Sequence, residues 1–150
     1  MSGAVQVTQG GPKTFTPADN ATVRGGRVVE AVAGGRIQEA GAASLVALGV
    51  ALTDAIAPED VSTSTANDAL GRPVLTAVAI PTKVAVAYAG TEVKVTYAAN
   101  ASFGQKLICA ANGTVTPAGA TPDARTLIGV CTEPGGVVIA TNAVGLMRIA

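Results

Sequence analysis

The sequence predicts an all-β fold, a small β-barrel or sandwich built from a duplicated β-hairpin unit, for three reasons. Short apolar runs recur along the chain, separated by glycine and proline, and none has the periodicity of an amphipathic helix. Several of these runs alternate apolar and polar residues, as half-buried strands do. One order of turns and apolar runs also occurs twice.

The duplicated unit is visible as two series of glycines that start or interrupt apolar runs. The matching pairs are Gly26 with Gly104, Gly35 with Gly113, and Gly49 with Gly129. The first two pairs lie 78 positions apart (104 − 26 and 113 − 35), and the third lies 80 apart (129 − 49). We therefore expect one β domain over residues 22–150, with its internal repeat at about 22–57 and 100–140.

Residues 1–21 are expected to form an extended N-terminal arm. Gly10-Gly11-Pro12 and Thr16-Pro17 interrupt any long element there. Such an arm can fray in solution, or it can order on a partner by adding a strand. In the second case, the expected partner contacts are Val5, Gln6, Val7, Thr8 and Phe15.

The first copy is expected to hold strands at about 27–33, 36–40 and 45–52. The pair Gly34 and Gly35 predicts the turn between the first two, because glycine adopts positive φ without strain. Residues 43–48 are also compatible with a short helix, but the β-branched residues at the matching place in the second copy favour a strand. The polar residues 58–73 are expected to form a long loop, either mobile or in contact with a neighbouring subunit.

Three more strands are expected at about 74–80, 83–88 and 92–97. Apolar and polar residues alternate in the last two, which predicts half-buried hairpin strands. The second copy follows, with Asn112 and Gly113 at its turn, and residues 143–149 supply a closing strand.

Charge and composition argue for a structural protein with a partner. Ten basic and ten acidic residues are interspersed, so the sequence shows no footprint for nucleic acid. No apolar stretch is long enough for a membrane span, and the N-terminus lacks the pattern of a signal peptide, so synthesis and folding in the cytosol are expected. Charged residues make up only 13% of the chain, which is consistent with a partly covered surface or with a monomer rich in Ala, Thr and Ser.

The sequence offers little for chemistry. The chain has no histidine, which excludes Ser-His and Cys-His mechanisms. Cys109 and Cys131 match small apolar residues of the first copy and are expected in the core; a disulfide between them is the alternative. The adjacent Glu59 and Asp60 are most simply solvated. We therefore expect no enzyme, cofactor, metal or small-molecule substrate; a carboxylate enzyme, the rival, would need acidic residues that converge in a cleft.

The chain resembles a known family. The residues that carry this resemblance are Gly104-Gln105-Lys106-Leu107, Asn112-Gly113-Thr114-Val115, Ile128-Gly129-Val130-Cys131, Val137-Val138-Ile139 and Val144-Gly145-Leu146. This succession is similar to that of the small decoration, or cement, proteins of tailed-bacteriophage heads. The motifs are short and made of common residues, and the resemblance covers most of residues 22–150 and leaves out the arm.

The resemblance implies a β-tulip-like domain on the capsid surface of a virion, made in the cytoplasm of the host bacterium. It implies the major capsid protein as partner, a homotrimer, and a role in stabilising the shell, with neither nucleic acid nor membrane as partner. The family supplies no catalytic residues to assign here. The alternative function is that of another phage or bacterial structural β domain, such as a tail, adhesin or receptor-binding module.

Overall fold

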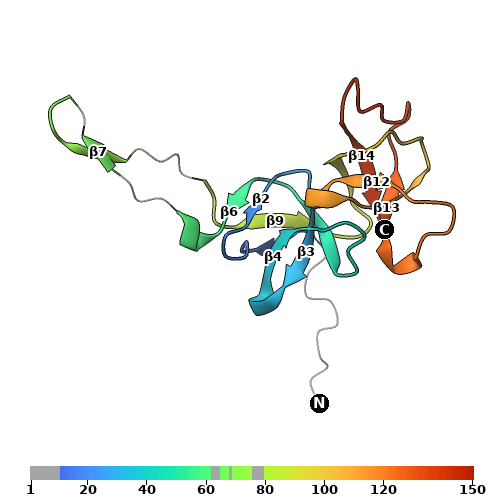
Figure 1. The fold of residues 1–150 in the computed structure, drawn as a ribbon, viewed down its shortest axis with the longest axis horizontal. Coiled ribbons are helices and arrows are strands. Elements are labelled where there is room, and N and C mark those ends of the chain that lie inside the picture. The colour runs from blue at the N-terminus through green and yellow to red at the C-terminus, as the bar shows by residue number, and fades with distance from the viewer. Residues whose placement is uncertain (1–10, 62–64, 68, 76–79) are drawn as a thin grey trace, which may run out of the picture.

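The computed structural model describes residues 11–61, 65–67, 69–75 and 80–150, and it confirms the all-β prediction. The strands form two five-stranded sheets and two two-stranded ribbons, and every ladder is antiparallel. Figure 1 shows the first sheet in the middle of the molecule and the second, coloured from yellow to red, at one end. The described strands form no closed barrel.

The first sheet has the strand order β1-β9-β5-β3-β4. Its strands are β1 (Lys13–Phe15), β3 (Val28–Val32), β4 (Arg36–Glu39), β5 (Ala47–Ala51) and β9 (Val84–Ala87). A short ribbon of β2 (Thr22–Val23) and β6 (Ala55–Ile56) lies beside it. Two 3₁₀ turns belong to this half, η1 (Ala33–Gly35) and η2 (Pro58–Asp60).

The second sheet has the order β10-β14-β13-β11-β12. Its strands are β10 (Glu92–Thr96), β11 (Lys106–Cys109), β12 (Val115–Pro117), β13 (Leu127–Cys131) and β14 (Val144–Ile149), and its 3₁₀ turns are η3 (Ala111–Gly113) and η4 (Ala124–Thr126). The path of the chain is therefore the same in both sheets: the strand that comes first in each half pairs with the one that comes last.

The two sheets agree down to their irregularities. The register between β3 and β5 shifts after Val29, which lies opposite Gly49, and the register between β11 and β13 shifts after Leu107, opposite Gly129. Both glycines are required by close packing. A Cβ on Gly49 would collide with the carbonyl oxygen of Ala87, and a Cβ on Gly129 would lie 2.5 Å from that of Arg148. The repeated glycines therefore occupy matching places in the two sheets.

Two clusters of buried side chains form the core. The first lies within the first half and consists of Val23, Val29, Ile37, Ala51, Ala55, Val84 and Val86. The second fills the second half with residues such as Leu107, Cys131 and Met147, and it also takes in Val28, Ala40, Val50 and Ala87 from the first half. The second core therefore holds the halves together, because apolar surface from both is buried in it.

Backbone hydrogen bonds cross the same boundary. The Gly113 amide donates to the Ala40 carbonyl (2.8 Å), the Ala43 amide to Cys109 (2.9 Å), and the Thr96 amide to Gly26 (3.0 Å). Together with the shared core, these bonds join the two sheets into one packed unit.

The expected N-terminal arm needs a correction. Residues 1–10 lie outside the described residues, but residues 13–15 form β1 and pair with β9. Pro17 is buried and bridges Ile37 at the other edge of the sheet. Strand β1 ends before Pro17, as expected for a proline, but the proline does not prevent the strand from forming. The part of the expected arm from residue 13 onward therefore belongs to the sheet.

The expected polar loop 58–73 also differs. After η2, residues 65–67 form β7 (Thr65–Asn67), which pairs with β8 (Pro73–Leu75). Figure 1 shows this hairpin standing away from both sheets, at the end of the molecule opposite the second half. The strand expected at 74–80 is therefore β8 in part, and residues 76–79 lie outside the described residues. The other strands for which bounds were predicted are present within two residues of those bounds.

Candidate interaction surfaces

Of the predicted partner contacts, only Phe15 lies among the described residues; Val5, Gln6, Val7 and Thr8 do not. The Phe15 ring packs against the first core and meets Tyr88 nearly edge-on, with 6.4 Å between the ring centroids. Lys13 Nζ lies 5.5 Å from the centroid of the same ring. Phe15 is thus half-buried, and its packing fastens β1 to the sheet.

The four predicted turn residues all adopt left-handed backbone conformations. Gly34 and Gly35 have φ of 78° and 70° in η1, and Asn112 and Gly113 have φ of 55° and 65° in η3. Asparagine and glycine tolerate this region better than other residues. The two turns differ in their surroundings: η1 is exposed, whereas Gly113 packs against the backbone of Val28.

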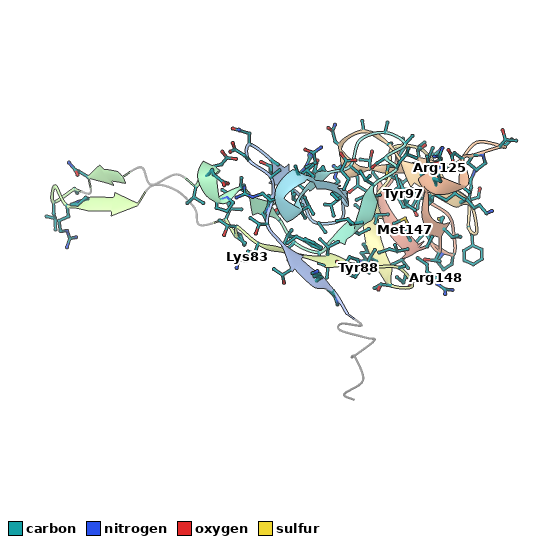
Figure 2. All side chains as sticks on the ribbon, turned by 90° about the horizontal axis from the view of Figure 1, so that it is seen from below. Lys83, Tyr88, Tyr97, Arg125, Met147 and Arg148 are labelled. Atoms are coloured by element: carbon teal, nitrogen blue, oxygen red, sulfur yellow. The ribbon has the colours of Figure 1, made fainter. Side chains whose placement is uncertain are left out.

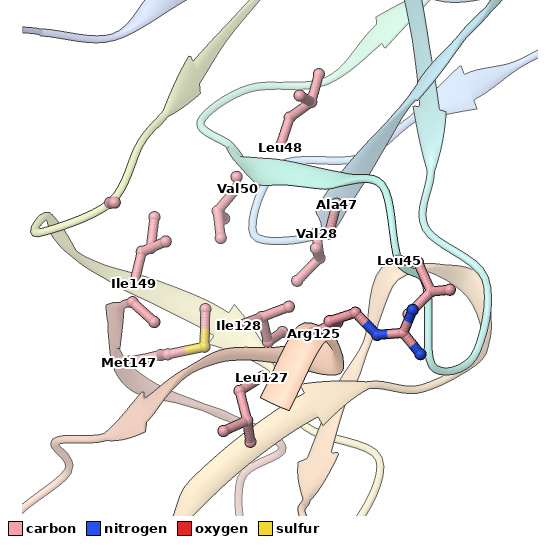
Figure 3. A pocket seen from close by; sticks show the side chains of 13 residues that line it. Val28, Leu45, Ala47, Leu48, Val50, Arg125, Leu127, Ile128, Met147 and Ile149 are labelled. Atoms are coloured by element: carbon pink, nitrogen blue, oxygen red, sulfur yellow. The ribbon is translucent and has the colours of Figure 1, made fainter. Parts of the chain in front are cut away.

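A small cleft of about 110 Å³ opens where β5 faces β13 and β14 (Figure 3). Its walls are mainly aliphatic side chains, including Val50, Ile128, Met147 and Ile149. Arg125 is the one charged side chain among the residues that line it. No carboxylate, hydroxyl or thiol side chain lines this cleft, so it is a packing crevice between the halves and offers no convergent acid.

Three arginines on the surface are engaged in ion pairs. Arg24 pairs with Glu39 (2.7 Å), Arg125 with Asp123 (2.7 Å), and Arg36 with Glu59 (2.9 Å). The hydrogen bond from Arg36 lowers the pKa of Glu59, and the hydrogen bond from Arg125 lowers the pKa of Asp123. Glu59, one of the two adjacent carboxylates noted in the sequence, is therefore held in its charged form by an arginine.

Glu30 is a half-buried carboxylate with several donors around it. It accepts hydrogen bonds from Gln38 Nε2 (2.8 Å) and the Gly41 amide (3.2 Å). Burial alone would raise its pKa, but the hydrogen bonds from Ser44, Gln38 and Gly41 outweigh that effect and lower the pKa. The donors therefore stabilise the charged carboxylate in its half-buried place.

The two cysteines are free and buried, with 1% of Cys109 and none of Cys131 exposed. Burial raises the pKa of the Cys109 thiol to about 11, and the negative charge of Glu30 adds to the effect. Both side chains belong to the second core. They behave as small apolar residues, and the alternative of a disulfide is not realised in the structure.

Exposed apolar side chains gather on one face of the second half. Phe103 is 65% exposed, Val138 51% and Val144 45%. They border three neighbouring shallow hollows. Phe103 and Val138 line the first, Val138 and Val144 line the second, and Val144 lines the third. This apolar strip was not predicted from the sequence, because its members come from segments far apart in the chain.

The described residues contain no group of three or more Cys, Asp or Glu side chains placed to share a metal ion. No helix in the described part of the chain is long and apolar enough to cross a bilayer.

No family model matches the chain, and no curated protein sequence matches it either. Among solved structures, it is similar to one described as the crystal structure of head fiber gp8.5 N base in bacteriophage phi29. The TM-score is 0.55 and the sequence identity 17%, and the match covers 93% of this chain and 94% of that one. The two proteins therefore share a fold over nearly their whole lengths.

Proposed function

We propose that this chain is a structural virion protein that binds the outer surface of an assembled bacteriophage head and stabilises it, as a decoration or cement protein. The observation that carries the proposal is the fold shared with the base of a phage head fibre over 93% of this chain. The sequence motifs similar to those of decoration proteins point to the same place on a virion. The expected partner is the major capsid protein, and the role requires no catalysis, cofactor or small-molecule substrate.

Stabilisation follows from selective binding. A protein that binds the mature lattice and not its precursor favours the mature form by about 2.7 kcal/mol per site when its free concentration is a hundred times Kd. Such a gain is small for one site and large for a shell with many sites. The exposed apolar side chains Phe103, Val138 and Val144 suit contacts between proteins, since exposed apolar surface of this kind marks interaction sites.

We further propose that the chain acts as a homotrimer. A shared trimer axis lets one oligomer bind several capsid subunits at once, which raises its avidity without any new kind of contact. Native mass spectrometry of the purified chain tests this: three times the mass of one chain supports it, and a monomer at micromolar concentration contradicts it.

The base of a head fibre is the second candidate, favoured by the description of the similar structure. Such a base attaches to the head without needing to strengthen it. A tail, adhesin or receptor-binding module remains the alternative from the sequence.

One experiment separates these functions. Virions of the phage that encodes the chain are purified with and without it, imaged by electron cryo-microscopy, and heated while DNA release is followed. A cement protein appears on the shell and raises the temperature of DNA release. A fibre base appears on the shell without that rise, and density on the tail alone overturns the proposal.

A further inference from the structure

The outer face of the second sheet combines basic and aliphatic side chains. Lys94 in β10, Lys106 in β11 and Arg148 in β14 are exposed on it. Val130 of β13 lies directly between Lys106 and Arg148 in the strand register, so the backbone positions of these two residues are about 10 Å apart, two strand spacings. Half-buried Leu146 lies opposite Lys94. We call the residues Lys94, Lys106, Val130, Leu146 and Arg148 the basic face.

The cations of the basic face form no ion pair within the described residues. Arg24, Arg36 and Arg125 each have a carboxylate partner. Glu92 is the one acidic residue among the exposed positions of β10 and β14, and it lies directly opposite Arg148 in the strand register. Three cations against this one carboxylate leave the sheet face with net positive charge.

Glu133 lies at the border of the basic face, where it lines the same hollow as Lys94 and Leu146. Its carboxylate accepts a hydrogen bond from the Leu146 amide (3.1 Å). Lys94, Lys106 and Arg148 outnumber Glu92 and Glu133 there and surround an aliphatic centre, which suits a partner that brings further carboxylates.

The matching face of the first sheet is already a protein interface. There the row that corresponds to Lys106, Val130 and Arg148 consists of Val28, Val50 and Ala87. All three of those residues are buried in the core that joins the two halves. The same geometric surface therefore packs on protein in one half and stands exposed, with two cations in place of apolar residues, in the other.

We propose that the basic face docks on an acidic patch of the capsid shell, formed by clustered Asp or Glu side chains around an aliphatic centre. This inference rests on the proposed function and adds to it which surface of the chain faces the shell and the charge of the surface it meets. Aliphatic residues between the cations favour a protein partner, because single-stranded nucleic acid is usually bound on aromatic platforms.

The test uses heads of the phage that encodes this chain, assembled without it, and the full chain added back at several NaCl concentrations. The double variant Lys106→Glu with Arg148→Glu reverses two charges of the basic face. The matched control is Lys13→Glu with Lys83→Glu, which reverses two exposed lysines outside the basic face, one in β1 and one directly before β9. Figure 2 shows Lys83 far along the molecule from Arg148. Co-sedimentation measures the bound fraction, and urea unfolding checks that each variant is folded.

The unaltered chain should bind more weakly as NaCl rises, because salt screens exposed charges. The variant of the basic face should lose about tenfold or more in apparent affinity, whereas the control should stay within about twofold. Equal losses in both variants would show an effect of net charge alone and overturn the inference.

Unaffected binding by a folded basic-face variant overturns the docking surface and leaves the proposed function standing. Failure of the unaltered chain to bind heads overturns the proposed function, and this inference with it. A short DNA duplex serves as the second probe: if the variant loses binding to DNA and keeps binding to heads, the face belongs to nucleic acid and the inference is wrong.

Discussion

The junction between the halves predicts that the same substitution has unequal effects at two matching turns. Gly35 in η1 and Gly113 in η3 have nearly equal φ, 70° and 65°. A Cβ on Gly35 would meet no atom within 4 Å. A Cβ on Gly113 would lie 2.5 Å from the Val28 carbonyl oxygen and 3.0 Å from the Arg27 Cβ. Alanine therefore adds backbone strain at both sites and a steric clash at only one.

The expected magnitudes follow from these contacts. A residue with a Cβ in the left-handed region costs about 1–2 kcal/mol, so Gly35→Ala should lower the free energy of unfolding by that amount. Gly113→Ala carries the same strain and about 1–3 kcal/mol more, because overpacking forces the β3 backbone away from the turn. The difference between the two variants, about 1–3 kcal/mol, measures how tightly η3 packs on β3.

Urea unfolding followed by circular dichroism measures this difference. Both variants must be compared at one protein concentration, because self-association makes apparent stability depend on concentration. The unfolding midpoints should also separate by about 2–4 °C in Tm for each kcal/mol. Equal destabilisation of the two variants would refute the packing of Gly113 against Val28, and with it the way the halves are joined.

Three further predictions concern buried and half-buried side chains. Neither Cys109 nor Cys131 should react with a thiol reagent in the native protein at pH 8, and both should react after unfolding. The reason is that both side chains are buried and that burial raises the pKa of the Cys109 thiol to about 11. Reaction of one thiol in the native protein at pH 8 would contradict this prediction. The pKa of Glu30 is lowered in the folded state, so its contribution to stability is present above its ordinary pKa of 4.5 and is lost as pH falls through the lower folded value. In acid-unfolding curves, Glu30→Gln should therefore make the loss of stability below pH 4.5 less steep. An unchanged slope would count against the hydrogen bonds of Glu30. Tyr97→Phe removes the bond from the buried hydroxyl to the Leu146 carbonyl (2.8 Å) and should cost about 1 kcal/mol in urea unfolding.

The sequence predicted the strands best where turn glycines bounded them. Gly34, Gly35 and Gly113 stand where the backbone needs positive φ, so their spacing located the hairpins. It failed for β1, since three residues between Pro12 and Pro17 are too few to show a period. Strand β7 was missed for another reason: Thr65-Ala66-Asn67 lies in a polar stretch whose composition is typical of loops.

The interaction surfaces were less predictable than the strands. Lys94, Lys106 and Arg148 never form a run in the sequence, and only the register of four strands brings them to one face. The exposed Phe103 and Val138 likewise come from different segments. Such surfaces depend on long-range pairing, which a residue pattern read along the chain does not contain.

The comparison of the two halves gives a physical reason why one matching surface is permanent and the other available. Val28, Val50 and Ala87 bury their apolar area in the core of the chain itself, so this contact forms once, during folding. Lys106 and Arg148 keep the matching face hydrated, and each would have to lose water before a contact could form there. A partner that supplies carboxylates offsets that cost, whereas a further apolar sheet does not. The same fold can therefore use one surface to hold itself together and its counterpart to select an acidic partner.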